Sequence, residues 1–307
     1  MPDHFVEVKE LVKHYPGVKA VDGISFHIEQ GEVFGFLGPN GAGKTTTIEM
    51  MEGLRSPDSG SVTIAGKNPH RHNNEFKQII GVQLQASAME DNIKPHEALT
   101  LFGSFYRQSL DADYLLEMVG LKDKVNNYYS KLSGGQKQRL SLAIALVNDP
   151  RMVFLDEPST GLDAQARRSI GEIIKRLKTE NRTVLLTTHY IEEAESLCDR
   201  VAIIDHGKII ALGTPSELIS KSKMSHRIQF KTRDELSQST RDELSGKFGE
   251  IEQVNGMMVL KSDKAGKPLV ELIKMLEAEG NELTELMLQR PTLEDVFIEL
   301  TGRRIRD

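Results

Sequence analysis

The chain has 307 residues, of which 38% are hydrophobic and 27% charged, and its formal net charge at pH 7 is −6. This balance is that of an ordinary globular protein with room for one large domain and a small one. Acidic and basic residues are interspersed, so no basic face is expected and nucleic acid is not an expected partner. The single cysteine, Cys198, excludes an intrachain disulfide framework and is expected to be a small buried side chain.

The sequence contains no stretch that resembles a signal peptide or a membrane span. Its first residues, MPDHFVEVKE, lack an apolar signal core, and the longest apolar runs are only a few residues long. We therefore expect a cytoplasmic protein that reaches a membrane only when another protein holds it there.

The first 80 residues read as short alternating strands separated by glycine turns. The strands are expected at residues 5–8, 24–28, 32–37 and 61–65. A helical stretch follows at residues 45–54, where Ile48, Met51 and Leu54 recur at three-residue spacing. This part of the chain is expected to form an antiparallel β subdomain.

Between the strand at 32–37 and this helix, residues 38–46 read GPNGAGKTT and match the phosphate-loop pattern G-x-x-x-x-G-K-[ST]. Glycines allow the backbone N–H groups to turn inward, a lysine reaches the β- and γ-phosphates, and a threonine hydroxyl binds Mg²⁺. A plain glycine turn is the alternative, but the strand, loop and helix occur in the order that a phosphate loop requires. The predicted ATP-binding residues are Gly38, Pro39, Asn40, Gly41, Ala42, Gly43, Lys44, Thr45 and Thr46.

Residues of about 87–150 are mostly helical in pattern and interrupt an alternation of strands and helices, which indicates an inserted helical lobe. After the lobe come a buried strand in MVFLDEP, an amphipathic helix, a second buried strand in TVLLTTH, a short helix and a hairpin turning at His206 and Gly207. Short apolar strands between helices predict a mainly parallel sheet and thus an α/β fold.

The pattern turns polar at residues 221–226, and the remainder is expected to form a small α+β domain. Its order is strand, helix, two strands around Asn255 and Gly256, helix and strand, which is the order of a ferredoxin-like split βαβ unit. A last helix follows, with a capping box from Thr292 to Asp295 and an end at Gly302. Its expected apolar stripe is Leu293, Val296, Phe297 and Leu300. The expected domains are residues 1–220 and 221–307.

Polar residues lie at the carboxyl ends of several of the predicted parallel strands. Asp156 and Glu157 follow one strand, where the first can hold the Mg²⁺ shell and the second can polarise an attacking water. His189 follows the next and can contact the γ-phosphate and hold the water in line with Glu157. A solvated acidic edge and a structural histidine are the alternatives, but parallel strands bring their carboxyl ends to one crevice. In IIGVQLQ, Gln85 is expected to reach the metal and the water, with Gln83 as the competing candidate.

A second anion cradle is predicted in KLSGGQKQRL, where Ser133, Gly134, Gly135 and Gln136 begin a helix. One phosphate loop binds a nucleotide but does not close over its γ-phosphate. We expect the second cradle to supply this cover from another subunit, so that a two-fold homodimer holds ATP at its interface. ATP binding would close such a dimer, and hydrolysis would reopen it.

Four segments together, GPNGAGKTT, KLSGGQKQRL, MVFLDEPSTGLD and TTHYIEEAESLCDRV, resemble the ATP-binding subunit of an ABC transporter over residues 4–220. The resemblance implies an ATPase with ATP and Mg²⁺ as cofactors. It also implies these roles: Walker A for Lys44 and Thr45, Q-loop for Gln85, signature for Ser133 to Gln136, Walker B for Asp156 and Glu157, D-loop for Asp163, switch for His189 and adenine stacking for Tyr15. Thr45, Gln85 and Asp156 are the implied metal ligands, and Glu157, His189 and Gln85 the implied catalytic residues.

The carboxyl-terminal segment PTLEDVFIELTGR resembles that of multidrug and daunorubicin-resistance exporters, which pair with a separately encoded membrane permease. The resemblance implies export of a drug, antibiotic or lipid-like substrate by an ATPase bound to the cytoplasmic face of the membrane. For the small domain, packing on its own ATPase or pairing of two such domains is an alternative to a regulatory role.

Two other classes of function are weighed against this one. Soluble ABC ATPases that act on ribosomes or DNA usually carry two cassettes or a long coiled coil, and this sequence has neither. A GTPase or nucleotide kinase shares only the phosphate loop. It leaves LSGGQ and His189 unexplained, and the guanine motif N-K-x-D does not occur.

Overall fold

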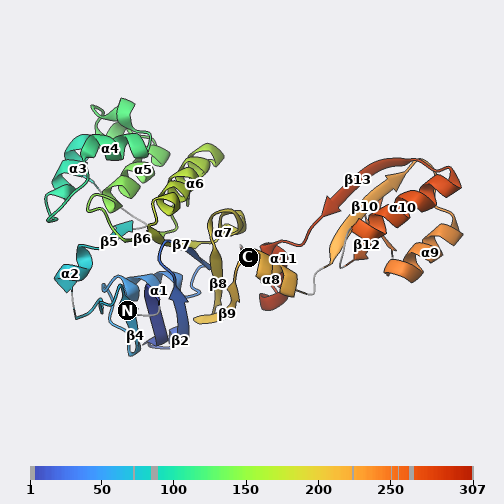
Figure 1. Cartoon of the computed structure of the whole chain (residues 1–307), viewed down its shortest axis with the longest axis horizontal. Coiled ribbons are helices and arrows are strands. Elements are labelled where there is room, and N and C mark those ends of the chain that lie inside the picture. Colours follow the sequence, from blue (N-terminus) through green and yellow to red (C-terminus); the bar gives the residue numbers. More distant parts are fainter. Residues whose placement is uncertain are drawn as a thin grey trace. The chain divides into compact units, whose positions relative to one another are not determined.

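The computed structural model describes residues 4–71, 73–83, 89–222, 225–249, 251–254, 256–262 and 266–305. They form two compact units, which Figure 1 draws in sequence colours. The first unit ends at Pro215 and also includes Ile305, and the second is Ser216–Arg304. The boundary lies after Pro215 rather than after residue 220, because most of helix α8 (Pro215–Lys221) belongs to the second unit.

A six-stranded sheet forms the centre of the first unit, with the order β5-β6-β7-β3-β8-β9. All neighbours pair in parallel except the last two, which form the expected hairpin. Every residue of β3, β6 and β7 is buried, as expected for a parallel sheet covered on both faces. The strands are β3 Val33–Leu37, β5 Ile80–Gln83, β6 Met152–Asp156, β7 Thr183–Thr188, β8 Arg200–Asp205 and β9 Lys208–Gly213.

The expected antiparallel subdomain is a three-stranded sheet in the order β2-β1-β4. Its strands are β1 Val6–Tyr15, β2 Val18–Ile28 and β4 Ser59–Ile64, and they are longer than the apolar runs predicted. The centre of the Phe26 ring on β2 lies 5.5 Å from the ring centre of Phe34 and 5.3 Å from that of Phe36, both on β3. This aromatic contact joins the two sheets into one core.

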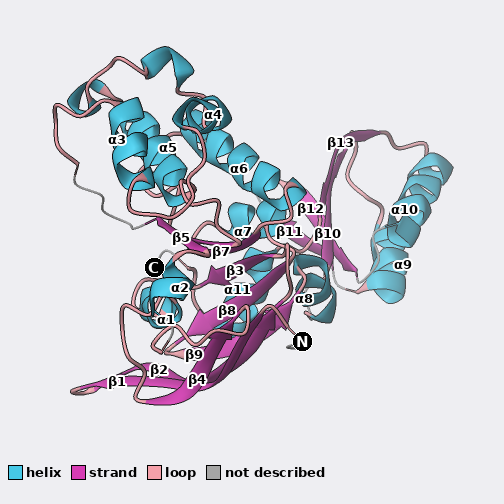
Figure 2. Cartoon of the chain, turned by 60° about the vertical axis from the view of Figure 1, so that its left-hand side comes forward, coloured by secondary structure: helices cyan, strands magenta, loops and turns pink. Residues whose placement is uncertain are grey.

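Helices complete the first unit: α1 Lys44–Met51, α2 Asn73–Lys77, α3 Pro95–Gly103, α4 Ala112–Met118, α5 Gly134–Ala145, α6 Ala164–Thr179 and α7 Ile191–Leu197. Helices α3, α4 and α5 gather into the expected lobe, away from the antiparallel sheet (Figure 2). The helix predicted over residues 45–54 is shorter than expected. Helix α1 ends at Met51, and Leu54 is 64% exposed. Gly53, with φ at 77°, takes the left-handed conformation that ends a helix.

The second unit has the topology of a ferredoxin-like fold, with the sheet order β11-β12-β10-β13 and antiparallel pairs throughout. Its core includes Ile228, Phe230, Leu260, Leu272 and Leu276. The elements are β10 His226–Thr232, α9 Gln238–Phe248, β11 Ile251–Val254, β12 Met257–Ser262, α10 Gly266–Glu279, β13 Leu283–Gln289 and α11 Leu293–Thr301.

Helix α11 has the predicted ends. Thr292 and Asp295 form the capping box, and Gly302 takes the left-handed conformation at the end of the helix. Leu293, Val296 and Phe297 are buried, whereas Leu300 is 46% exposed and does not belong to the buried stripe.

Gly81 on β5 is a position where the fold accepts no side chain. A Cβ there would lie 1.8 Å from the carbonyl oxygen of Ala145, at the end of α5. We expect Gly81→Ala to lower the free energy of unfolding by about 1–3 kcal/mol or more, because β5 and α5 must separate. Gly171→Ala, in α6, is the matched control. Its Cβ meets only Leu197 at an ordinary 3.4 Å, so it should be neutral or stabilising in urea denaturation. Equal stability of the two variants would contradict this packing.

Candidate active site

The phosphate loop connects β3 to α1, and its backbone is held by neighbours that leave no room for side chains. Gly43 has φ at 106°, and a Cβ there would lie 2.2 Å from the carbonyl oxygen of Ala20 on β2. A Cβ on Gly38 would lie 2.3 Å from the carbonyl oxygen of Ile204 on β8. The loop conformation therefore depends on glycine, and it leads directly into the amino-terminal end of a helix, where anions bind.

Lys44 begins α1, and its side chain is only 4% exposed. Its ammonium group donates hydrogen bonds to the carbonyl oxygens of Gly38 and Pro39 at 2.7 and 3.0 Å and lies 3.6 Å from Oε1 of Glu157. Burial lowers the pKa of Lys44, while Glu157 and Asp156 oppose this shift. A buried cation with two carbonyl partners is poised to exchange them for a phosphate anion.

Asp156, the last residue of β6, is buried and accepts hydrogen bonds from two hydroxyl groups. Thr187 Oγ1 donates to its Oδ1 at 2.5 Å, and Thr45 Oγ1 donates to its Oδ2 at 3.1 Å. A carboxylate and a threonine hydroxyl next to a phosphate loop are oxygen ligands of the kind that Mg²⁺ prefers. The structure thus brings together Thr45 and Asp156, two of the three expected metal ligands.

Glu157 follows β6 in a strained conformation, with φ at 49°. Such backbone costs about 1–3 kcal/mol and is held here by the N–H of Glu157, which donates to Thr187 Oγ1 at 2.8 Å. Thr160 Oγ1 donates to its Oε2 at 2.9 Å, and His189 Nδ1 lies 3.3 Å from the same oxygen. The carboxylate is 9% exposed and stands between Lys44 and His189.

The sequence reasoning missed the residues that position this acid and histidine. Ser159 and Thr188 both donate to the carboxylate of Glu193 on α7, and the N–H of Tyr190 donates to Thr188 Oγ1. This links the segment after β6 to the segment after β7 and fixes the backbone on both sides of the site. The sequence did offer a signal for these residues. The hydroxyl side chains in PST lie within three residues after Glu157, and those in TTH lie within two residues before His189.

Of the two glutamines predicted as candidates for the metal and water, the structure describes only Gln83. Gln85 lies outside the described residues. Gln83 ends β5 in register with Leu155, next to Asp156. Its amide is buried, and neither its Nε2 nor its Oε1 has a hydrogen-bond partner among the described residues. A buried amide that lacks partners is costly, so Gln83 stays a candidate polar group at this edge.

The LSGGQ segment forms a capping box at the start of α5. Ser133 Oγ accepts from the N–H of Gln136, and Gln136 Oε1 accepts from the N–H of Ser133. Residues 133–136 line a pocket of about 450 Å³ together with 161–163, and Asp163 caps α6 by accepting from the N–H of Ala166. No residue of the phosphate loop lines this pocket within the part of the chain that the structure describes. The two anion cradles are therefore separate sites on one chain.

Tyr15, the residue predicted to contact adenine, ends β1 and is half-buried. The guanidinium carbon of Arg55 lies 5.5 Å from the centre of its ring, and Lys13 Nζ lies at 5.8 Å. Arg55 is held by Glu49 of α1, at 2.6 Å. The ring of Tyr15 is therefore flanked by two cationic side chains at the end of β1.

Glu52, at the end of α1, is a buried carboxyl group that the sequence reasoning did not single out. Burial, with help from the charges of Asp156 and Glu49, raises the pKa of Glu52 to about 8 from its ordinary value of 4.5. Between these two pKa values the folded protein keeps a proton on Glu52 that the unfolded chain releases. The contribution of Glu52 to the free energy of unfolding is therefore fully present below pH 4.5 and is lost as the pH rises to about 8.

We therefore expect Glu52→Gln to flatten the pH dependence of the free energy of unfolding. Its gain over the wild type should grow with pH in this window, by on the order of 1 kcal/mol per pH unit. Urea denaturation at a series of pH values measures the slope. Glu117→Gln on α4 is the control, because Glu117 is 67% exposed. A slope that Glu52→Gln leaves unchanged would mean that Glu52 is ionised in the fold.

A phosphate loop and a buried acidic pair at the carboxyl ends of one parallel sheet define the class of P-loop nucleotide hydrolases. The comparisons with known proteins narrow this class. Residues 21–160 match the family described as ABC transporter. Within the described residues, no helix is long and apolar enough to cross a membrane.

Two relatives match the chain over nearly its whole length. A Nod factor export ATP-binding protein I of Paraburkholderia xenovorans is 38% identical, with 100% of both chains covered. A linearmycin resistance ATP-binding protein of Bacillus subtilis is 36% identical, over 98% of this chain and 100% of the relative. Among solved structures, a dimeric ATP-binding cassette in a post-hydrolysis state with ADP and Pi has a TM-score of 0.61 and 25% identity, over 68% of this chain and 98% of the other.

The chain therefore belongs to the ABC transporter family, as an ATP-binding subunit of the exporter type. It is an ATPase, and the similar cassette with ADP and Pi is a dimer. The family resemblance found in the sequence is confirmed, and the soluble and GTPase alternatives are set aside.

Proposed function

We propose that Glu157 is the group that polarises the lytic water and that His189 holds this water and the γ-phosphate in line. The observation that carries the proposal is the gathering of Lys44, Glu157 and His189 within 3.6 Å contacts at the carboxyl ends of three neighbouring strands. Thr45 and Asp156 would hold Mg²⁺, which would neutralise charge on the phosphates. Tyr15 would stack on adenine, and Gln85 would complete the polar shell around the water.

In the proposed two-fold dimer, the signature segment, Ser133 to Gln136, would bind the partner's nucleotide. The N–H groups of Gly134 and Gly135 open α5 and have no acceptor within that helix. In a two-fold dimer they would cover the γ-phosphate bound to the partner's phosphate loop, and Asp163 would lie beside the same site. ATP then becomes part of the interface, so that binding closes the dimer and hydrolysis weakens it.

The permease is proposed to dock on a groove beside the helical lobe. The groove has a volume of about 670 Å³ and is lined by Leu54, Phe102, Phe105, Tyr106 and Ile144, with Glu52 at its side. Leu54 and Phe105 are 64% and 68% exposed, which is a high cost in water for side chains of this size. The groove adjoins the ends of α1 and β5, so a segment seated there would sense the closing of the site.

Because its relatives include exporters linked to Nod factor and to linearmycin resistance, we propose that this chain powers efflux of an amphiphilic or antibiotic-like molecule from the cytoplasmic face of the membrane. Cargo selection would belong to the permease. The second unit is proposed to act as an accessory domain of this assembly.

Purification of the tagged chain from gently solubilised membranes of its host tests the assembly. A stoichiometric polytopic membrane protein should co-purify, and Phe105→Asp should remove it. Val270→Asp is the matched control, because Val270 is 51% exposed on α10 of the second unit. Co-purification that survives Phe105→Asp would reject the groove, and a chain that is bound to ribosomes and absent from membranes would reject the transporter role.

A further inference from the structure

Outside the nucleotide site, two histidines and one glutamate meet at the edge of the amino-terminal sheet. His4 lies two residues before β1, His27 lies near the end of β2, and Glu29 follows β2. The antiparallel register pairs Val6 with Ile28, which places the start of β1 beside the end of β2. None of the contacts described above for the phosphate loop and the acidic pair involves these three residues.

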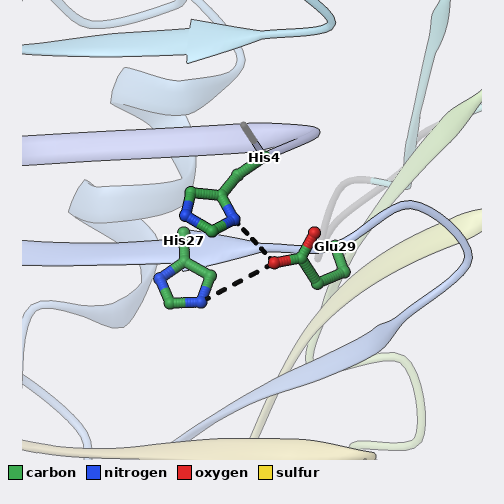
Figure 3. A group of neighbouring side chains, drawn as sticks. All are labelled: His4, His27 and Glu29. Carbon is green, nitrogen blue, oxygen red and sulfur yellow. Dashed lines mark hydrogen bonds and ion pairs between the residues drawn. The ribbon is translucent and has the colours of Figure 1, made fainter. Parts of the chain in front are cut away.

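The three side chains direct their ligand atoms toward one another (Figure 3). His4 Nδ1 lies 2.6 Å and His27 Nε2 lies 3.8 Å from Oε1 of Glu29. The imidazole rings are stacked with their centres 3.9 Å apart, so both present a nitrogen on the same side. One donor atom from each residue lies within 4.8 Å of the others. Small side-chain rotations would bring all three to about 2.0–2.2 Å from a common ion.

We propose that His4, His27 and Glu29 bind one divalent transition-metal ion, for which Zn²⁺ is the best chemical match. Two imidazoles and one carboxylate are a recurrent zinc ligand set, and water would complete the tetrahedron. Mg²⁺ is a poor match, because it prefers oxygen ligands in an octahedron. The side chains of His4, His27 and Glu29 are 32%, 40% and 52% exposed, so an ion can reach them from solvent.

One cation near the cluster is engaged by an acid outside it. Arg200 itself is directed at Glu32, at 3.4 Å, and donates to the carbonyl oxygen of His27. Glu7, opposite His27 on β1, is a second carboxylate beside the cluster and pairs with Lys9 at 2.8 Å.

A bound ion would join the segment before β1, at His4, to the end of β2. Neither the pocket at the signature segment nor the groove beside the helical lobe is lined by these three residues, so we assign the cluster a structural role rather than a catalytic one. An ion that binds the folded sheet and not the unfolded chain raises the unfolding midpoint. This role is independent of the proposed nucleotide chemistry and does not rest on it.

The test is a Co²⁺ titration of the tag-free, full-length protein, followed by visible absorption. Excess Mg²⁺ and no nucleotide are present, so that oxygen-ligand sites such as Thr45 and Asp156 are already filled. We expect tetrahedral d–d bands that saturate at one equivalent and disappear when Zn²⁺ is added. Loss of a direct ligand in His27→Ala should weaken binding by at least about tenfold, since even indirect partners contribute that much.

His70→Ala is the matched control, because His70 is an exposed histidine of the same unit outside the cluster. It should keep the bands and the Zn²⁺-dependent rise in unfolding midpoint. Glu29→Gln keeps a polar side chain of the same shape, so it decides the matter if His27→Ala folds poorly by circular dichroism. Bands that persist without His27 and Glu29, bands that His70→Ala removes, or no binding in excess Mg²⁺ would each overturn the proposal.

Discussion

Glu157→Gln should reduce ATP turnover by about two to four orders of magnitude while leaving ATP bound. The carboxylate stands 3.6 Å from Lys44 Nζ and 3.3 Å from His189 Nδ1, which is the position on which the proposed role as the base rests. An amide of the same shape keeps the hydrogen bond from Thr160 but does not attract a proton. Hydrolysis would stop after dimer closure, and the protein should accumulate as an ATP-retaining dimer.

Two measurements check this result: steady-state phosphate release, and size-exclusion chromatography with MgATP. Glu172→Gln is the control, because Glu172 lies on the exposed face of α6, and it should behave as the wild type. A Glu157→Gln protein that neither turns over nor forms the ATP-bound dimer would place the defect in binding or folding. The role proposed for Glu157 would then be wrong.

The sequence predicted those parts of the fold that have a local signal. Runs such as MVFLD and TVLLTT are buried at every residue because both sheet faces are covered, and their continuous apolar centres, MVFL and VLL, identify buried parallel strands. The split βαβ order predicted the second unit, because the Asn-Gly pair in the sequence separates two short apolar runs, which form β11 and β12. Leu54 shows the limit of spacing alone: a glycine one residue earlier ends the helix and leaves the leucine exposed.

For the site, the motifs located the groups proposed to contact the nucleotide but not the residues that hold those groups in place. Thr187 bonds both Asp156 and the backbone of Glu157, and Glu193 joins the segments after two strands. Most of these contacts bring together residues far apart in the chain, as for the Thr187 and Asp156 pair with a separation of 31. Spacing along a sequence carries no direct signal for such contacts, which depend on which strands become neighbours.

Mixing two inactive variants, Lys44→Ala and Gly134→Glu, should restore ATPase activity. If the signature acts across the dimer, Lys44→Ala disables the chain's own phosphate loop and Gly134→Glu disables the site on the partner. A mixed dimer then holds one site that is broken twice and one that is intact. Random exchange of subunits gives half mixed dimers with one working site of two, so about one quarter of wild-type activity is expected. Placing both substitutions on one chain and mixing it with wild type should leave no working site in the mixed dimers.

The loss in Gly134→Glu should be functional and not structural. A Cβ at Gly134 meets nothing within 4 Å, and its backbone is ordinary helix, so the fold accepts a side chain there. A carboxylate in the first turn of α5 is favoured by the helix dipole, and replacing a helical glycine gains about 0.5–1 kcal/mol. Unfolding should therefore be unchanged or harder while turnover falls by about a hundredfold, because the new charge faces a triphosphate. Urea denaturation checks that both single variants are folded. If they are folded and mixing them does not restore activity, the signature acts on the nucleotide of its own chain, and the shared site is rejected.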